Sequence, residues 1–426
     1  MEITNLRRHI ENGGLKESFT FLYGDSEKSF TYQKNRYDEA LFKFSRHFPL
    51  RKDVHIYSAP GRTEIGGNHT DHQNGAVLAG AVNLDAVGIV AFHSEGIVRI
   101  ASKGFETIEV SINDLSDDKK GQGSESIVRG ILTKFIQNGV GIGGFDMYCT
   151  SNVLKGGGIS SSAAFEILIC TVINCRYNNA KENPYELAKI GWYAENKYFG
   201  KKCGLLDQTV SSYGGLVGIS FSNPETPIAE QIYYDFEKSG YSICLTDTKS
   251  SHENLTDEYA AIRDEMNQIA SFFGCDVLSK VNEAEFYGRI KGLRKEYGDR
   301  AVLRSIHFFD ETKRAKEETE ALKRNDIKRF LALVNESGDS SWKLLQNNYC
   351  TKTPENQEIP LAITLSKKVL GNDGAVRVHG GGFAGTIQAF VPIHKVDEYT
   401  ETMEKVFGEG SVYVLRIRPV GGIEIV

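Results

Sequence analysis

The chain has 426 residues, of which 40% are hydrophobic and 25% charged, and its formal net charge is −6. These totals are ordinary for a soluble globular protein of two or three domains. The net negative charge argues against nucleic acid and anionic membranes as partners, and the sequence has no apolar run of about 18 residues that would predict a membrane span.

The first third of the chain predicts an arm followed by strands. Residues 1–36 are polar and mixed in composition, which predicts an accessory N-terminal arm. Glycine or polar residues then separate four strand patterns, at residues 54–60, 86–92, 98–104 and 107–112. A helical pattern over 125–137 precedes a further strand pattern at 145–153.

A dense cluster of polar residues follows the first strand, in "APGRTEIGGNHTDHQNG" at residues 59–75. Directed hydrogen-bonding groups on a glycine-rich loop suit a sugar or another polyol, which must be held through many hydroxyls. Two other interpretations stay open. The loop is a solvated turn without function, or His69, Asp71 and His72 ligate a metal.

The stretch "LKGGGISSSAAFEILICTVI" (154–173) places three glycines and three serines before a strongly apolar helix. Glycines let backbone N–H groups approach a ligand closely, and the free N–H groups at a helix N-terminus favour an anion such as phosphate. Neither the Walker nor the Rossmann pattern is present. The alternative interpretation is a serine N-cap after a flexible loop.

A second helix begins at Asn183 and Pro184 and is predicted to end at Gly200. Glu195 lies near its end, and Asp207 follows twelve residues later. For Glu195 the alternative to a functional role is a salt bridge. For Asp207 it is the N-cap of the next helix.

The pattern changes between residues 215 and 240, which predicts a domain boundary. A strand pattern at 241–248, charged helices over 310–348 and a strand–glycine–strand unit at 375–392 follow, and the tail is a candidate final strand. We therefore predict an α+β fold, not a doubly wound parallel sheet. The predicted divisions are an arm (1–36), an N-terminal domain (37–220) and a C-terminal domain (221–426) whose tail is a candidate to return to the first.

Five motifs together, in this order, resemble the galactokinase branch of the GHMP small-molecule kinases. "PGRTEIGGNHTDHQNGAVL" is similar to the galactokinase signature Gly-Arg-x-Asn-Leu-Ile-Gly-Glu-His-x-Asp-Tyr. "GGGISSSAAFE" resembles the family's phosphate loop, and "AENKYFGKKCGLLDQ" its Ala-Glu…Cys-Gly-Ile-Met-Asp-Gln segment. "HENLTDEYAAIRDEM" and "VRVHGGGFAG" resemble its two later motifs, so the resemblance spans roughly residues 37–392.

The resemblance implies a two-domain GHMP kinase fold with the active site in the interdomain cleft, and ATP and Mg²⁺ as cofactors. Asp207 would orient the anomeric hydroxyl of galactose, and Arg62 would stabilise Asp207 and the transferred phosphoryl group. Ser162 and Glu195 would hold Mg²⁺. The ATP phosphates would be bound by Gly156, Gly157, Gly158, Ile159, Ser160, Ser161, Ser162, Gly381 and Gly382. The sugar site would be lined by Asn68, His69, Thr70, Asp71, Gly204 and Tyr259.

The sequence departs from the family pattern at two places. Asn68 stands where galactokinases carry a glutamate that contacts the sugar's outer hydroxyl, and residues 71–73, "DHQ", resemble galacturonate kinases. Two carboxylates about 4 Å apart repel by roughly 4 kcal/mol at an effective dielectric of 20, so losing a glutamate would admit an acidic sugar. Ser124 and Ile127 replace the aromatic residues expected beside adenine.

The predicted function is an ATP-dependent kinase that phosphorylates galactose at the anomeric oxygen. Galacturonate kinase is the main alternative, and a non-catalytic sugar sensor or a mevalonate or homoserine kinase is a weaker one. The seven cysteines are scattered without a Cys-x-x-Cys pair, which predicts free thiols in a reducing cytoplasm. Partners are expected to be a sugar and ATP, with no nucleic acid or membrane, and the sequence does not determine the oligomeric state.

Overall fold

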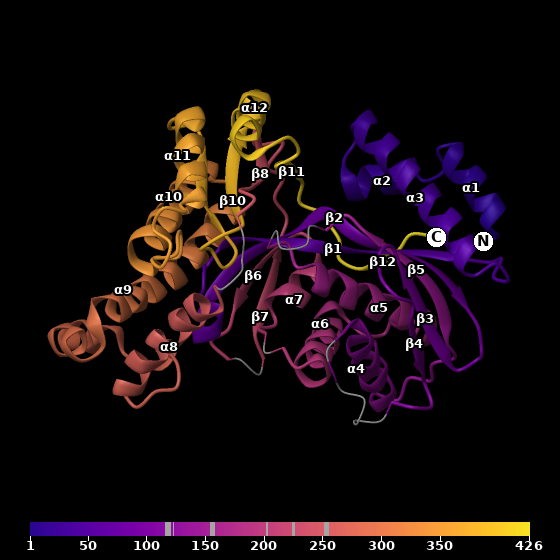
Figure 1. Cartoon of the computed structure of the whole chain (residues 1–426), viewed down its shortest axis with the longest axis horizontal. Helices are drawn as coiled ribbons and strands as arrows, with labels where there is room; N and C mark the ends of the chain where they lie inside the picture. The colour runs from indigo at the N-terminus through magenta and orange to yellow at the C-terminus, as the bar shows by residue number, and fades with distance from the viewer. Residues whose placement is uncertain (116–120, 122, 154–157, 202, 224–225, 251–254) are drawn as a thin grey trace.

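Two β-sheets and the helices around them organise the chain (Figure 1). The computed structural model describes residues 1–115, 121, 123–153, 158–201, 203–223, 226–250 and 255–426. The strands within this part are β1 (His55–Gly66), β2 (Ala76–Phe92), β3 (Ile97–Ser102), β4 (Ile108–Ser111), β5 (Phe145–Ser151), β6 (Leu216–Ser220), β7 (Ile228–Ile232), β8 (Tyr241–Asp247), β9 (Ala375–His379), β10 (Thr386–Pro392), β11 (Val412–Leu415) and β12 (Ile423–Glu424).

The helices fall between these strands and before the first of them. The α-helices of the described residues are α1 (Ile3–Glu11), α2 (Lys16–Tyr23), α3 (Glu27–His47), α4 (Ser124–Gln137), α5 (Ser161–Tyr177), α6 (Pro184–Tyr193), α7 (Leu206–Tyr213), α8 (Thr256–Phe272), α9 (Glu283–Lys323), α10 (Ile327–Ser340), α11 (Glu358–Leu370) and α12 (Val396–Phe407). Two π-helical segments, Ala194–Phe199 and Ser341–Leu345, continue α6 and α10 directly. Such segments are rare and occur often at functional sites.

The larger sheet is built around the long strand β2. Its first half pairs with β6 and its second half with β5, while β1 runs antiparallel along its other edge. The order of the main path is β12-β1-β2-β5-β3-β4, and β7 extends the sheet beyond β6. The pairing of β3 with β5 is parallel, and the other pairings described are antiparallel.

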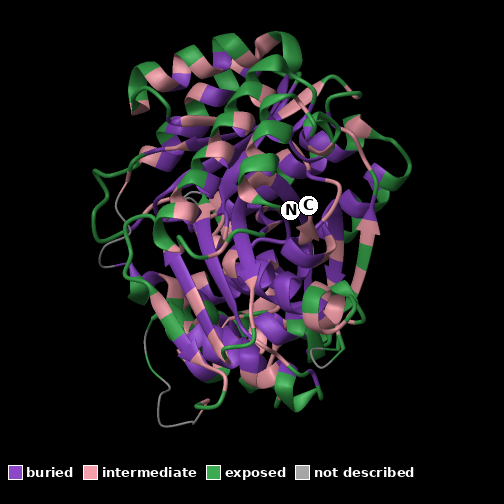
Figure 2. Ribbon diagram, turned by 90° about the vertical axis from the view of Figure 1, so that its right-hand side faces the viewer, coloured by how far each residue is buried: buried purple, intermediate pink, exposed green. Residues whose placement is uncertain are grey.

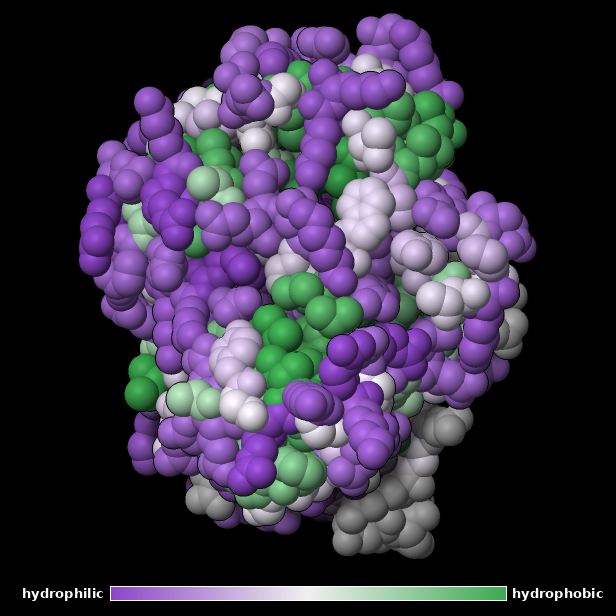
Figure 3. Space-filling view, turned by 90° about the vertical axis from the view of Figure 1, so that its left-hand side faces the viewer, coloured by the Kyte–Doolittle hydropathy of each residue, from purple (hydrophilic) through white to green (hydrophobic). Residues whose placement is uncertain are grey.

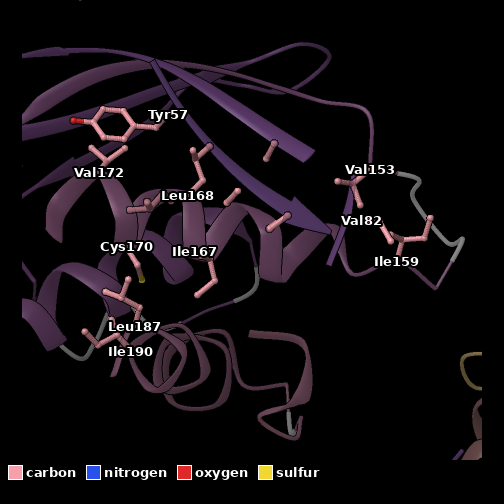
Figure 4. Packing of buried hydrophobic residues seen from close by; sticks show 14 of the residues in the cluster. Tyr57, Val82, Val153, Ile159, Ile167, Leu168, Cys170, Val172, Leu187 and Ile190 are labelled. Atoms are coloured by element: carbon pink, nitrogen blue, oxygen red, sulfur yellow. The ribbon is translucent and has the colours of Figure 1, made fainter. Parts of the chain in front are cut away.

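Helices cover both faces of this sheet because the side chains of β2 alternate between them. Val87, Ile89 and Ala91 pack against α1–α3, whereas Ala86 and Val90 face the core that contains α4 and α5. Figure 4 shows α5 side chains of this core between the sheet and α6, and Figure 2 shows the strands buried beneath exposed helical faces.

The smaller sheet has the antiparallel order β11-β8-β10-β9 and packs against α10, α11 and α12. The 41-residue helix α9 is interrupted at Gly298, where φ is 86°. Figure 3 shows the side of the molecule that carries α8 and α9, where hydrophilic side chains predominate and hydrophobic residues gather at the centre and near the upper right. The charged helices predicted over residues 310–348 are the second half of α9 and α10.

Most of the predicted elements are present. Asn183 accepts a hydrogen bond from the Glu186 N–H and so caps α6, as expected, and the apolar helix after the serines is α5. The boundary predicted at residue 36 falls inside α3, and the one predicted at residue 220 falls at the end of β6, before two further strands of the larger sheet, β7 and β12. The tail returns to the larger sheet, where β12 pairs with β1. Within the described part of the chain, none of the helices is both long and apolar enough to span a bilayer.

Candidate active site

The end of β1 approaches the segment that precedes α5 closely. The pairing of β1 with β2 shifts register between Pro60 and Arg62, as at a β-bulge. The Arg62 N–H donates to the Ile159 carbonyl at 3.0 Å. A Cβ at Gly61 would lie 2.8 Å from the same carbonyl oxygen, so this approach requires glycine.

Arg62 and Asp207 form an ion pair next to the N-terminus of α5. The Arg62 Nε and Nη2 atoms lie 2.7 Å and 2.6 Å from the Asp207 Oδ1 atom. The other Asp207 oxygen accepts a hydrogen bond from the Ser160 hydroxyl, and Arg62 Nη1 donates to the Gly158 carbonyl. The Asp207 side chain keeps 29% of its surface exposed and the Arg62 side chain 12%. The structure therefore brings the two predicted catalytic residues together, with one side of the carboxylate accessible.

The N-cap interpretation of Asp207 is wrong. The N-cap position of α7 is occupied by Leu205, and Asp207 is the second residue of the helix. Its side chain turns away from the helix backbone toward Arg62 and Ser160.

Ser160 occupies the N-cap position of α5 without capping it. Its φ is 55°, in the left-handed region, and its side chain makes no cap hydrogen bond because the hydroxyl donates to Asp207. The first N–H groups of α5 therefore depend on other acceptors, as expected of an anion site. Gly156 and Gly157, the first glycines of the predicted phosphate loop, lie outside the described residues.

Glu195 lies in the π-helical segment after α6 and faces the start of α5. Its Oε1 atom accepts hydrogen bonds from the Ser162 hydroxyl at 3.4 Å and from Lys201 Nζ at 2.9 Å. Its Oε2 atom accepts from Gln208 Nε2 and the Cys203 thiol. The salt-bridge interpretation of Glu195 is thus confirmed, and the partner is the exposed ammonium of Lys201.

The residues around Glu195 fit a magnesium ion. A buried carboxylate and a serine hydroxyl are oxygen ligands of the kind that Mg²⁺ takes, and Lys201 now supplies the positive charge that such an ion would bring. Burial raises the pKa of Glu166 well above its ordinary value, and the neighbouring Glu195 adds to this effect. Glu166 therefore favours its neutral form, so that Glu195 is not faced by a second negative charge. The described residues contain no group of three or more His, Cys, Asp and Glu side chains arranged for a metal.

The sugar-side residues meet the loop between β9 and β10. The His69 Nε2 atom lies 2.9 Å from the Gly381 carbonyl oxygen, and the Tyr259 hydroxyl donates to the Gly382 carbonyl at 2.9 Å. A Cβ at Gly381 would lie 2.6 Å from the Tyr259 ring. These contacts fix the glycine turn against the loop that follows β1.

Asp71 approaches the segment that carries Asp207. A Cβ placed on Gly204 would lie 3.1 Å from the Asp71 Oδ2 atom, so the two residues are neighbours. Thr70 is buried, and its hydroxyl donates to the carbonyls of Gly67 and Ala76, which closes the turn. Its hydroxyl is thus engaged within the turn, whereas Asp71 lies beside Gly204, three residues before Asp207 in the chain.

Asn68 is only 1% exposed, and its side-chain amide is hydrogen-bonded on every side. Its Nδ2 atom donates to the Glu64 Oε1 atom at 2.9 Å and to the Gly380 carbonyl at 2.8 Å. Its Oδ1 atom accepts from Asn347 at 2.9 Å and from Ser341 at 3.4 Å. Asn68 therefore links the loop after β1 to the C-terminal half of the chain.

Four residues that sequence reasoning did not assign also contribute: Glu64, Lys201, Gln208 and Arg377. Glu64 was part of the polar cluster at residues 59–75, and Gln208 ends the motif "CGLLDQ", so the sequence held a signal for both. Lys201 and Arg377 could be found only from the fold, because their partners are brought near by a π-helical turn and by sheet packing.

The chain is similar to proteins of known families. The galactokinase galactose-binding signature matches residues 43–92, and the GHMP kinases N-terminal domain matches residues 126–215. A galactokinase of Glaesserella parasuis serovar 5 is 33% identical over 371 residues, which cover 83% of this chain and 89% of that protein. The chain belongs to the galactokinase family. A second family member, from Mannheimia succiniciproducens, is 28% identical and covers 85% of the chain and 91% of its own length.

Solved structures of the wider family share the fold. The galactokinase of Lactococcus lactis, solved in complex with galactose, superposes with a TM-score of 0.75 at 22% identity and covers 90% of this chain and 98% of its own. The mevalonate kinase of Methanococcus jannaschii gives a TM-score of 0.60 at 16% identity, with 86% and 98% covered. The predicted two-domain GHMP kinase fold is therefore confirmed.

Proposed function

We propose that this galactokinase-family protein transfers the γ-phosphoryl group of ATP to the anomeric hydroxyl of galactose, giving galactose 1-phosphate and ADP. The observation that carries the proposal is the Arg62–Asp207 pair beside the N-terminus of α5. This arrangement sets a hydroxyl-orienting carboxylate next to an anion site, which is the geometry that phosphoryl transfer between an alcohol and a triphosphate requires.

The described residues suggest how the transfer proceeds. The acceptor hydroxyl binds the accessible side of Asp207 and takes the place of the Ser160 hydroxyl on that carboxylate. Its oxygen forms a bond to the γ-phosphorus while the bond to the bridging oxygen of ADP breaks, and its proton passes to Asp207 or to water. Arg62 stabilises the charge that develops on the transferred group, and its hold on Asp207 favours orientation over strong basicity.

Ser162 and Glu195 are the residues proposed to hold Mg²⁺. When bound, the ion would neutralise negative charge on the β- and γ-phosphates. Lys201 would release Glu195 to it, because the exposed ammonium can turn into solvent at little cost.

The galacturonate alternative depended on the loss of a negative charge at position 68. A carboxylate still lies beside position 68, because the Glu64 Oε1 atom accepts a hydrogen bond from the Asn68 amide at 2.9 Å. No observation favours an acidic acceptor over a neutral one. The sensor alternative is not favoured either, because Arg62, Asp207, Ser162 and Glu195 are all assembled.

An ADP-release assay with galactose, galacturonate, N-acetylgalactosamine and glucose tests the proposed substrate. Galactose is expected to give the highest kcat/KM. Turnover of galacturonate without turnover of galactose would contradict the proposal while leaving the family assignment intact.

We further propose that the protein works in the cytoplasm with a sugar and ATP as its ligands. All seven cysteines are free thiols, which suits a reducing compartment.

A further inference from the structure

We propose that Glu64 supplies the carboxylate that recognises the far end of the sugar acceptor, and that the buried Asn68 positions it. The inference rests on the proposed function, because it concerns the acceptor of the same site.

Asn68 has no hydrogen-bonding atom left for a ligand in this structure. Both protons of its amide nitrogen are donated, one to Glu64 and one to the Gly380 carbonyl, and its oxygen accepts from Asn347 and Ser341. The side chain is 1% exposed. A residue bound in this way holds its neighbours in place and does not itself meet a sugar hydroxyl.

Glu64 has the opposite character. It lies two residues beyond Arg62 on β1, where the pairing with β2 is regular, so the two side chains share a face about 6.6 Å apart. Its Oε1 atom is held by Asn68 at 2.9 Å and by Arg377 at 3.3 Å. Among the described residues no side-chain hydrogen bond or ion pair uses Oε2, and the side chain is 12% exposed, as is Arg62. The carboxylate is thus fixed through one oxygen and offers the other.

The two positions have changed together relative to the family. The galactokinase signature given above has asparagine four residues before glutamate, whereas this chain has Glu64 four residues before Asn68. Their contact explains the exchange. Two carboxylates here would repel each other, and two amides would remove the ion-pair partner of the buried Arg377. The exchanged pair keeps one carboxylate and one amide.

The position of Glu64 also determines the charge of the acceptor. Arg62 is paired with Asp207, and Arg377 is fully buried and paired with Glu64, so neither guanidinium is left for an acidic sugar. The Glu64 side chain lies on the same face of β1 as Arg62, and we assign its free oxygen to the outer hydroxyl of a neutral hexose. A uronate would place a second carboxylate against it.

The test is Glu64→Gln, which keeps the size of the side chain and removes its charge. We expect the KM for galactose to rise by about 10-fold or more, because a hydrogen bond to a charged group is lost. The KM for ATP should change by less than about twofold, and the preference for galactose over galacturonate should narrow. Glu398→Gln, a surface change on α12, is the matched control. Sugar binding is also measured as a thermal shift, so that the role of Glu64 in binding can be tested even if no turnover is seen.

A second variant covers the case in which Glu64→Gln does not fold. Glu64→Asp keeps the negative charge beside Arg377 but withdraws the carboxylate by one methylene group. It should weaken galactose binding and retain the rejection of galacturonate. A wild-type KM for galactose in either folded variant, with unchanged preference, would overturn the inference.

The wild-type protein separates this inference from the proposed function. If it uses or binds another neutral hexose in place of galactose, the proposed substrate is wrong. The role of Glu64 is then tested by measuring the KM of the Glu64 variants for that hexose. If it prefers galacturonate, the role proposed for Glu64 is wrong as well.

Discussion

The Arg62 guanidinium holds a single carboxylate oxygen of Asp207 through two nitrogens, Nε at 2.7 Å and Nη2 at 2.6 Å. The two residues are 145 positions apart in the chain, one on β1 and the other in the first turn of α7. The Ser160 hydroxyl contacts the other oxygen. The orientation of the carboxylate is therefore set before any substrate arrives, which is the condition for catalysis by positioning.

Asp207→Asn should remove most of the catalysis that comes from positioning, without changing the size of the side chain. The amide cannot form an ion pair with Arg62 or take up a proton, so kcat should fall by about 10³-fold or more, while nucleotide affinity stays within about threefold. Steady-state kinetics and a fluorescent-nucleotide titration measure the two quantities. Asp257→Asn is the surface control, since the Asp257 side chain is 85% exposed. A near-normal kcat in the Asp207 variant would disprove the role given to this residue.

Removal of divalent cations should stop turnover, and added Mg²⁺ should restore it. Ser162→Ala removes one of the two proposed ligands, so the Mg²⁺ concentration for half-maximal rate should rise on the order of tenfold. The measurement is the rate as a function of free Mg²⁺ at saturating sugar. Ser222→Ala, on the surface, should leave the curve unchanged. An identical curve for the Ser162 variant would exclude this residue as a ligand.

Gly61→Ala should separate Arg62 from the segment before α5, which is proposed to bind phosphate. The new Cβ would lie 2.8 Å from the Ile159 carbonyl oxygen and 3.0 Å from the Val153 side chain, so the backbone must move. We expect a higher KM for ATP, a lower kcat and a lower melting temperature. Gly141→Ala is the matched control, because a Cβ at Gly141 meets no atom within 4 Å. Equal behaviour of the two variants would show that the close approach at Gly61 is not needed.

Asp85 should stabilise the attachment of the N-terminal helices in a pH-dependent way. Its buried carboxylate binds Arg36 of α3 at 2.6 Å and Arg418 at 3.0 Å. Burial alone would raise its pKa, but the two guanidinium groups outweigh burial and hold the pKa below its ordinary value. Asp85→Asn would leave both cations uncompensated, which should cost about 3–5 kcal/mol of unfolding free energy at pH 7.

The sign of the pH dependence follows from the lowered pKa of Asp85. The stabilisation is fully present above the ordinary pKa of an aspartate, about 3.9, and is lost as the pH falls below it. The stability difference between wild type and Asp85→Asn should therefore be the same at pH 7 and pH 5 and smaller at pH 3.5, as measured by urea unfolding. A difference that grows on acidification would contradict this account.

Local sequence signals predicted several helices and strands correctly because each signal depends on neighbours in the chain. The cap at Asn183, the continuous apolar run of α5 and the strand patterns around β2 are such signals. The N-terminal arm was less well predicted, since α1–α3 gain their stability by packing on the sheet.

The contacts within the site could be found only once the fold was known. Nothing local to Arg62 indicates Asp207, and the resemblance to a family supplied that pairing. The hydrogen bond between Glu64 and Asn68 could not be predicted from the sequence, because a spacing of four residues on a strand and turn does not fix where the two side chains lie, unlike the same spacing on a helix. The ion pair of Lys201 with Glu195 depends on a π-helical turn that propensities do not predict.

Phosphorus NMR of the product formed from ATP, Mg²⁺ and galactose tests the central claim most directly. The account predicts one new phosphate ester, on the anomeric oxygen of galactose, together with an equal amount of ADP. Phosphate on a different hydroxyl, or ATP consumed only to inorganic phosphate, would contradict it.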